Sequence, residues 1–277
     1  MMEPRYFHTA SVLLNDNVLV AGGYNGSVSL KSVELYDPQT NNWTSLASMM
    51  ITRAYHTASL MPNGNVLVVG GYSSFTTNTV ELYDIQTKAW TSLASMATAR
   101  RYHTSTVLSD GRLLVIGGYS GTDYLKTVEV YDLQTNNWTS LANMTAMPRR
   151  YHTTSVLSDG NVLVAGGASS SMTYVDTAEL YNSSTKNWTS IASMKRIRLY
   201  HTSSLLLNGL VLVVGGHGYT FQETAELYNP ATQTWAYTES MARPRGYHTA
   251  SVLSNGEVVV VGGYNGVILN TVESYYP

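Results

Sequence analysis

The chain has 277 residues and no cysteine, and it carries 16 Lys and Arg against 18 Asp and Glu, a net charge of −2 at pH 7. The absence of thiols excludes disulfides, thiolate metal sites and cysteine nucleophiles, and the near-neutral charge argues against nucleic acid or a membrane surface as partner. Charged residues make up only 12% of the chain, whereas Tyr alone numbers 21. This bias favours strands and tight turns, so we expect an all-β fold.

One sequence unit returns six times along the chain, and a histidine marks each copy. A Gly-Gly pair follows each histidine after nearly the same interval. The copies span residues 1–52, 53–99, 100–148, 149–197, 198–244 and 245–277, and we expect them to form one domain over 1–277. The marker histidines are His8, His56, His103, His152, His201 and His248.

Each copy predicts four short strands in the same order, as the third copy illustrates. Residues 103–108 form the first strand, and Asp110-Gly111 predicts a tight hairpin turn. Residues 112–118 are almost wholly apolar, as expected of a strand buried on both faces. After a variable loop come residues 127–132, then a turn, then residues 138–144. A single antiparallel meander of this size cannot bury both its faces, so the copies must stack on one another.

Four-stranded units repeated at a period near 50 indicate the blades of a β-propeller. The sequence resembles the Kelch family, which belongs to the galactose-oxidase-like propellers, in four repeated features. These are an Arg-x-aromatic-His opening, the Gly-Gly pair, a Glu-x-Tyr pair such as Glu129/Tyr131, and a Trp such as Trp138. The resemblance covers essentially the whole chain and implies a six-bladed Kelch propeller with four-stranded antiparallel blades.

The sixth copy ends after its third expected strand. Five copies carry the Trp strand, but the chain stops at Tyr276-Pro277 where the sixth is due, and Met1 aligns with Met49, each four residues before a repeated arginine. In similar Kelch propellers a strand from one terminus commonly completes a blade begun at the other, and neither terminus here carries that piece. We therefore expect a last blade of three strands with an exposed edge. A natural design and a truncated gene model both fit this pattern.

Two repeated polar positions each allow two interpretations. The marker histidines either have a hydrogen-bonded structural role or form a metal ring, and we favour the structural role because blades pack face to face. The repeated arginines either pair with the repeated glutamates or, as the resemblance to Kelch adaptors of ubiquitin ligases implies, form a crown open to acidic ligands. They are Arg5, Arg53, Arg100, Arg149, Arg198 and Arg245.

Positions that vary between copies at one end of the ring predict the binding face. One set directly follows the Gly-Gly pairs and a second directly follows the repeated arginines. Tyr and Arg, which are enriched at binding hot spots, dominate both sets, although some of these tyrosines alternatively only pack against the next blade. The predicted binding residues are Tyr6, Tyr24, Tyr72, Arg101, Tyr119, Arg150, His217 and Tyr264.

No motif predicts catalysis: the chain has no phosphate-binding loop, no GxSxG and no HExxH. Galactose oxidase builds its copper radical site on a tyrosine cross-linked to a cysteine, which this chain lacks. The candidate acids and bases of the variable loops, Asp123, Asp176, His217 and Glu223, are scattered over three blades. We expect a monomeric, non-catalytic scaffold for a protein or peptide, with no cofactor and no metal. A glycan-binding or sugar-transforming propeller is the alternative. Without a signal peptide or transmembrane stretch, we expect a cytoplasmic protein.

Overall fold

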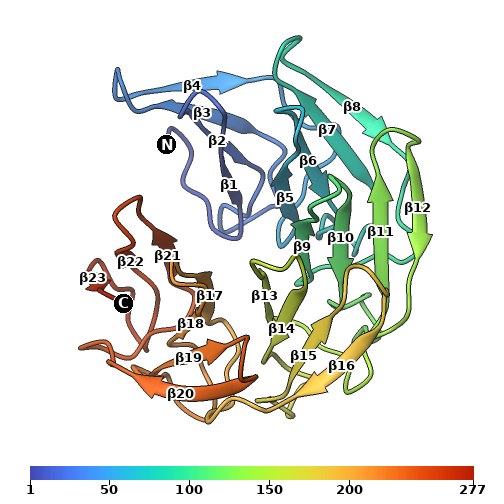
Figure 1. Ribbon diagram of the computed structural model, residues 1–277. Helices are drawn as coiled ribbons and strands as arrows, with labels where there is room; N and C mark the ends of the chain where they lie inside the picture. The colour runs from blue at the N-terminus through green and yellow to red at the C-terminus, as the bar shows by residue number, and fades with distance from the viewer. The chain divides into compact units, whose positions relative to one another are not determined.

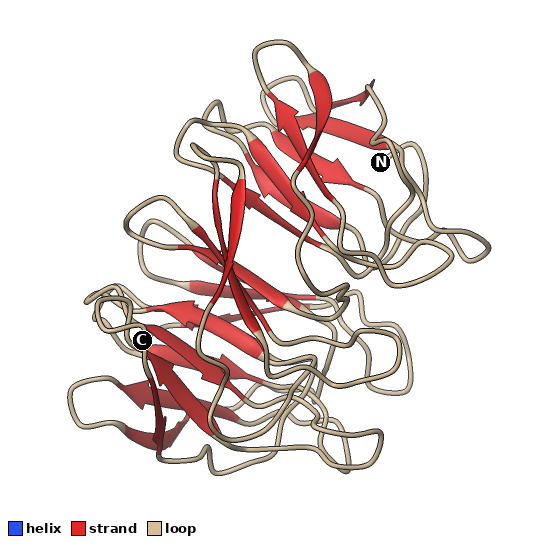
Figure 2. Ribbon diagram, turned by 90° about the vertical axis from the view of Figure 1, so that its right-hand side faces the viewer, coloured by secondary structure: helices blue, strands red, loops and turns tan.

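The computed structural model describes residues 1–277, and it contains strands and loops without a helix (Figures 1 and 2). The strands form five four-stranded sheets and one three-stranded sheet, all antiparallel between sequential neighbours. This all-β, six-bladed propeller, with its last blade one strand short, confirms the predicted fold class. None of its elements is a helix long and apolar enough to cross a membrane.

By its internal contacts the chain divides into two compact units, Met1–Leu141 (unit 1) and Ala142–Pro277 (unit 2). Unit 1 holds the strands of blades 1 to 3. Blade 1 has β1 (Thr9–Val12), β2 (Val18–Ala21), β3 (Val33–Asp37) and β4 (Asn42–Leu46). Blade 2 has β5 (Thr57–Leu60), β6 (Val66–Val69), β7 (Val80–Asp84) and β8 (Ala89–Leu93). Blade 3 has β9 (Thr104–Val107), β10 (Leu113–Ile116), β11 (Val128–Asp132) and β12 (Asn137–Ser140).

Unit 2 holds the strands of blades 4 to 6. Blade 4 has β13 (Thr153–Val156), β14 (Val162–Ala165), β15 (Ala178–Tyr181) and β16 (Trp188–Ile191). Blade 5 has β17 (Thr202–Leu205), β18 (Val211–Val214), β19 (Ala225–Asn229) and β20 (Thr234–Thr238). Blade 6 has β21 (Thr249–Val252), β22 (Val258–Val261) and β23 (Val272–Tyr275).

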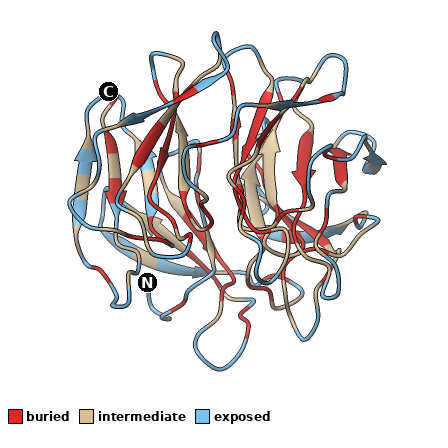
Figure 3. Ribbon diagram, turned by 90° about the horizontal axis from the view of Figure 1, so that it is seen from below, coloured by how far each residue is buried: buried red, intermediate tan, exposed pale blue.

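The second strands form the core, because both of their faces are covered by neighbouring blades. Every residue of β6, β10, β14 and β18 is buried, whereas the fourth strands are largely exposed (Figure 3). Each second strand is a run of Val, Leu, Ile and Ala, whose burial on two faces removes apolar surface from water and stabilises the stack. The apolar run at residues 112–118 is therefore the doubly buried strand that its composition predicts.

In blades 2 to 5 the tryptophan of the fourth strand bonds its blade to the one before. In unit 1, Trp90 of blade 2 shares an apolar cluster with Ala21, Val33 and Met49 of blade 1. Its indole Nε1 also donates a hydrogen bond to the carbonyl of Ala47, at 2.8 Å. The same bond runs from Trp138 to Ala94, from Trp188 to Ala142 and from Trp235 to Ala192, at 2.7 to 2.9 Å. A buried indole N–H needs such an acceptor, so this contact fixes how far the outer strand reaches toward its neighbour.

Candidate functional site

The repeated arginines are buried and paired, so the structure supports the first of their two interpretations and contradicts the open crown. Each guanidinium side chain has no exposed surface, and it forms an ion pair with the repeated glutamate of its own blade. The pairs are Arg5–Glu34, Arg53–Glu81, Arg100–Glu129, Arg149–Glu179, Arg198–Glu226 and Arg245–Glu273. An acidic ligand has no access to these guanidinium groups.

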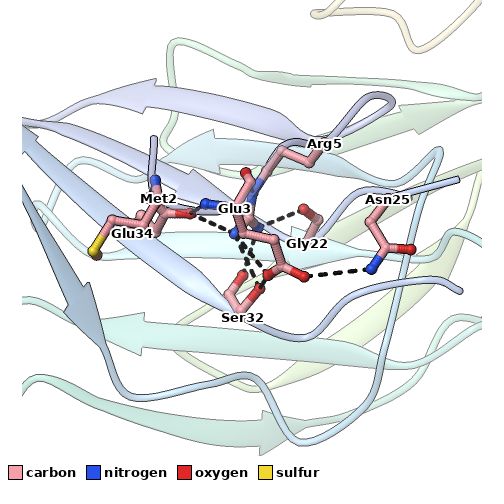
Figure 4. Close-up of polar contacts among 7 residues, drawn as sticks. All are labelled: Met2, Glu3, Arg5, Gly22, Asn25, Ser32 and Glu34. Atoms are coloured by element: carbon pink, nitrogen blue, oxygen red, sulfur yellow. Dashed lines mark hydrogen bonds and ion pairs between the residues drawn. The ribbon is translucent and has the colours of Figure 1, made fainter.

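Each pair also fastens the segment that leads into its blade, as blade 1 shows in Figure 4. Arg5 donates to Glu34 at 2.7 Å and to the carbonyls of Gly22 and Ser32, while Glu34 accepts the backbone N–H of Met2 at 2.6 Å. Burial alone opposes ionisation of Glu34, but the N–H groups of Met2 and Glu3 and the guanidinium of Arg5 together outweigh it and lower its pKa. The buried ion pair, called the latch below, therefore holds the segment that enters the blade against the third strand of that blade. Its role is structural.

The marker histidines are structural too. Those of blades 2 to 6 are buried, and in blades 2, 3, 5 and 6 the ring lies against the first strand of the preceding blade. His56 Nε2 lies 3.0 Å from Thr9 Oγ1, and the bonds between Thr57 and His103, Thr153 and His201, and Thr202 and His248 repeat this contact at 2.9 to 3.0 Å. No group of three or more His, Cys, Asp or Glu side chains is placed to hold a metal ion.

The two variable sets of the predicted binding face are brought together within every blade. An isolated antiparallel bridge joins the residue after the repeated arginine to the residue after the Gly-Gly pair. These bridges are Tyr6–Tyr24, Ala54–Tyr72, Arg101–Tyr119, Arg150–Ala168, Leu199–His217 and Gly246–Tyr264. In each blade the segment after the repeated arginine thus lies beside the segment after the Gly-Gly pair, and the two variable residues are adjacent.

In unit 1 these positions surround one arginine with aromatic rings. The Arg101 guanidinium carbon lies 4.6 Å from the centre of the Tyr72 ring, 5.4 Å from that of Tyr119 and 5.3 Å from that of Tyr102. Its Nε is buried and has no hydrogen-bond partner. Tyr6 and Tyr24, on blade 1, meet edge to face at 5.4 Å. A cation held over several ring faces is fixed in orientation.

In unit 2 the predicted residues line a cavity of about 270 Å³. Arg150, His217 and Tyr264 all belong to its wall, together with Phe221 and Tyr174. His217 packs edge to face on Phe221 at 4.7 Å, and burial lowers the pKa of its imidazole below the ordinary value. The ring is therefore neutral at pH 7 and can both donate and accept a hydrogen bond.

The sequence analysis missed a third set of site residues, the aromatic side chain directly before each marker histidine. All six have φ between 56° and 58°, a left-handed conformation that bulky residues rarely adopt. The rings contact one another in series within each unit. In unit 1, Phe7 lies tilted on Tyr55 at 4.2 Å and Tyr55 meets Tyr102 edge to face at 4.6 Å. In unit 2, Tyr151 lies tilted on Tyr200 at 4.2 Å and Tyr200 stacks on Tyr247 at 3.8 Å. The last three also line the unit 2 cavity. The available signal was an aromatic residue in all six copies.

The scattered acids of the variable loops do not join His217. Asp176 and Glu223 line a different cavity of about 390 Å³ in unit 2, together with Lys195 and Arg196. No carboxylate lines the cavity that holds His217, and Asp123 belongs to unit 1. The structure therefore assembles no pair of carboxylate and imidazole for general acid and base chemistry at this site.

Comparisons with known proteins bear on the fold. The family model described as the Attractin/LZTR1 beta-propeller matches residues 73–273, and the Kelch motif matches residues 5–50. The solved structure of YjhT has a TM-score of 0.79 and 16% sequence identity, covering 98% of this chain and 94% of that chain. No curated protein matches the sequence. Because 708 chains of solved structures match, the fold is too widely shared to specify a function by itself.

Proposed function

This chain belongs to the Attractin/LZTR1 β-propeller family and carries the Kelch motif that its repeats predicted, and on that premise we propose that it is a non-catalytic scaffold that binds a protein or peptide through its Tyr and Arg side chains. The observation that carries this proposal is the pairing of an arginine with aromatic rings in each unit. Arg101 lies among the rings of Tyr72, Tyr102 and Tyr119, and Arg150 lies 4.7 Å from the ring centre of Tyr151 beside the unit 2 cavity.

Such groups suit a polypeptide partner for physical reasons. Tyr offers a large, rigid contact area with a polar tip, and it loses little conformational entropy on binding. Arg101, half-buried among these rings, carries guanidinium N–H groups that can donate hydrogen bonds to a backbone carbonyl or a carboxylate of a partner. The partner chemistry that this favours is a segment rich in acceptors.

The size of the unit 2 cavity sets what enters it. A space of about 270 Å³ lies just below the usual range for small-molecule sites, and it accommodates a side chain or two of a partner. Binding energy in protein interfaces concentrates in such anchor residues, which fill pockets near the centre of the contact. We expect an aromatic or aliphatic anchor of the partner to enter the cavity and pack on the contacting rings of Phe221 and Tyr264, with Arg150 in the wall beside it.

Selection of phage-displayed random peptides on the purified chain tests this proposal. Peptides that bind the intact chain should lose at least about tenfold in affinity on Arg150→Ala or Tyr264→Ala, the loss typical of a hot-spot side chain. Arg101→Ala reports on unit 1 separately. Tyr237→Ala, which removes an exposed tyrosine of the outermost strand β20 that does not line this cavity, is the control and should leave peptide binding unchanged. Failure to select any peptide, or equal loss with the control, rejects the site.

A glycan ligand is the second candidate, and the stacked rings favour it, since Tyr151, Tyr200 and Tyr247 line the unit 2 cavity. A glycan array probed with the intact chain and with Tyr264→Ala separates the two candidates. Saturable binding of one sugar class that the variant abolishes, with no peptide selected, assigns the cavity to a glycan and overturns the peptide proposal.

A further inference from the structure

The Asn-Gly dipeptides of the chain differ in how their reactive groups are held. In such a dipeptide the backbone nitrogen of the glycine can attack the side-chain carboxamide of the asparagine, because glycine has no Cβ to block the approach. Hydrogen bonds to the glycine N–H or to the carboxamide oppose this attack, since they must break first. The dipeptides begin at Asn25, Asn63, Asn208, Asn255 and Asn265.

Three of these dipeptides lie in hairpin turns between a first and a second strand, where both groups are bonded. Asn63 Oδ1 accepts the N–H of Asn65 at 3.1 Å, and the N–H of Gly64 donates to the carbonyl of Met61 at 2.9 Å. The dipeptides at Asn208 and Asn255 repeat both bonds, at 2.9 to 3.1 Å. Side-chain bonds of this kind fix the asparagine within its turn, so these three dipeptides are protected.

The other two dipeptides stand in the identical sequence GGYNG, in the loops that join β2 to β3 and β22 to β23 (Figure 1). In both copies the glycine N–H makes no hydrogen bond within the chain, and a Cβ added to the glycine would meet no atom within 4 Å. The two copies therefore offer the same nucleophile, and the side chain of the asparagine distinguishes them.

The carboxamide is held at Asn25 and unbound at Asn265. Asn25 Oδ1 accepts the N–H groups of Ser27 and Val28, each at 3.0 Å. The hydrogen bond that Asn265 makes is from its backbone N–H to the carbonyl of Val267, at 3.2 Å. Of the five dipeptides, the one at Asn265 thus has both reactive groups free.

The length of the loop explains this difference. The isolated bridge that closes the loop joins residues five apart in blades 1 and 3 and four apart in blades 2, 5 and 6. In the longer form the side-chain oxygen of the first loop residue accepts two backbone N–H groups, at Asn25 and at Ser120. In the shorter form the backbone N–H of that residue donates to the carbonyl two residues on, at Ser73, Gly218 and Asn265.

We propose that Asn265-Gly266 is a site of spontaneous covalent modification, at which Asn265 becomes an aspartyl or isoaspartyl residue. The backbone nitrogen of Gly266 bonds to Cγ of Asn265, the Cγ–Nδ2 bond breaks, and Nδ2 leaves as ammonia with the proton of the Gly266 N–H. Water then opens the cyclic imide. Hydrolysis at Cγ gives aspartate, and hydrolysis at the backbone carbonyl carbon gives isoaspartate, in which the chain runs through Cγ. The exposed loop, in which Ile268 is 89% exposed, admits the water.

The modification places a charge on a loop that has none. Residues 264–270 contain no Asp, Glu, Lys, Arg or His, whereas an aspartyl carboxylate is ionised at pH 7. Asn265 directly follows Tyr264, which lines the unit 2 cavity together with Arg150. The modified chain therefore gains a negative charge next in sequence to a residue of that wall. The reaction itself does not depend on the binding function proposed above.

The unaltered protein tests the proposal. The purified chain is incubated in mildly alkaline buffer, and tandem mass spectrometry of its digest locates each exchange of an amide for a carboxylate over time. In the folded chain Asn265 should react at least about fivefold faster than Asn25, which must first break two hydrogen bonds. In guanidinium chloride the two GGYNG copies should react at similar rates. Equal rates in the folded chain, or the same ratio of rates in the folded and the unfolded chain, overturn the proposal.

An exchange of loops tests the cause. Replacing residues 265–268 (NGVI) by the blade 1 sequence NGSVS lengthens the loop by one residue and should slow the reaction of Asn265 to about the rate of Asn25. Ile268→Ser, which alters an exposed side chain without changing the loop length, is the matched control and should react as the parent does. Thermal unfolding shows whether both variants fold. An exchanged loop that folds and reacts at the parental rate overturns the proposal, and if it does not fold, the comparison on the unaltered protein decides.

Discussion

Replacing Arg198 by Met tests how much one buried latch stabilises unit 2. The guanidinium makes five hydrogen bonds: two to Glu226, one to each carbonyl of Gly215 and Thr224, and one to Thr224 Oγ1. Methionine has a comparable apolar stem but none of the donors, so the variant leaves a fully buried carboxylate with the N–H of Lys195 as its remaining donor among these contacts. Breaking a buried pair from one side costs about 3–5 kcal/mol, because the other charge stays uncompensated.

Arg245→Met is the matched comparison within the same unit. Arg245 donates to the carbonyls of Gly262 and Thr271 and pairs with Glu273, in the same arrangement as Arg198. The carboxylate of Glu273 is 20% exposed, so water can solvate it after the substitution. We expect a smaller loss of about 1–3 kcal/mol, the cost of the lost hydrogen bonds to charged groups.

Urea unfolding followed by far-UV circular dichroism measures both losses, with the midpoint shift converted through the slope of the parent protein. The reasoning requires the Arg198 variant to be less stable than the Arg245 variant. Equal losses, or a loss below about 1 kcal/mol for Arg198→Met, would refute it, since a buried unpaired carboxylate cannot be so inexpensive.

Two further predictions use matched positions and the pH. Gly70→Ala and Gly262→Ala place a side chain at nearly the same left-handed backbone conformation, with φ of 63° and 66°, and this conformation costs each variant about 1–2 kcal/mol. The new Cβ at Gly70 also lies 2.5 Å from the carbonyl oxygen of Arg100, whereas the nearest atom to the Cβ at Gly262 is 3.5 Å away. Thermal unfolding should therefore show a clearly larger loss of stability for Gly70→Ala than for Gly262→Ala. Burial, with the charge of Arg53 as a second cause, lowers the pKa of His56 to about 3 in the folded protein. Between pH 6.5 and pH 3 the unfolded chain therefore binds a proton at His56 that the folded protein does not. The free energy of unfolding has its full value above pH 6.5 and declines as the pH falls toward 3, by about 2 kcal/mol at pH 5. The difference between the urea midpoints at pH 7 and pH 5 should therefore be smaller for His56→Gln than for the parent protein. An equal difference in both proteins would contradict the lowered pKa of His56.

Much of the fold could be predicted because the repeat supplies six readings of the same local chemistry. The apolar run of residues 113–116, the turn residues after the first strand and the absent sixth Trp strand all follow from residue types and spacing, and the structure confirms them. The fate of the repeated arginines could not be settled in that way. A guanidinium three residues before a marker histidine fits a solvent-facing loop and a buried pair equally well, and only the register that places Gly215 and Glu226 around Arg198 decides between them.

The sequence predicted that the two variable sets lie together, and their role in binding stays a prediction. The isolated bridges place the two variable sets together, as the strand directions implied. How far Arg150 leans onto Tyr151 could not be read from the sequence, because ring contacts between consecutive residues depend on side-chain rotamers. The positive φ of Tyr151 was hidden for a related reason: tyrosine seldom adopts it, so residue type gives no warning.

The aromatic positions before the marker histidines show where the distinction between repeated and variable positions fails. Repeated positions were assigned to packing, and the arginines, glutamates and histidines obey that rule. At the aromatic position the left-handed turn does two things at once. It points the backbone N–H of Tyr102 at the carbonyl of Tyr55 on the preceding blade, at 3.2 Å, and it lets the Tyr102 ring contact the equivalent ring of Tyr55 edge to face, at 4.6 Å. In each unit, a repeated link between blades is therefore also part of a row of aromatic rings. Arg101 and Arg150 lie against these rings, 5.3 Å from Tyr102 and 4.7 Å from Tyr151, so the repeated rings orient the variable charges. For the function proposed above, we expect selectivity for a partner to depend on which blades carry those charges.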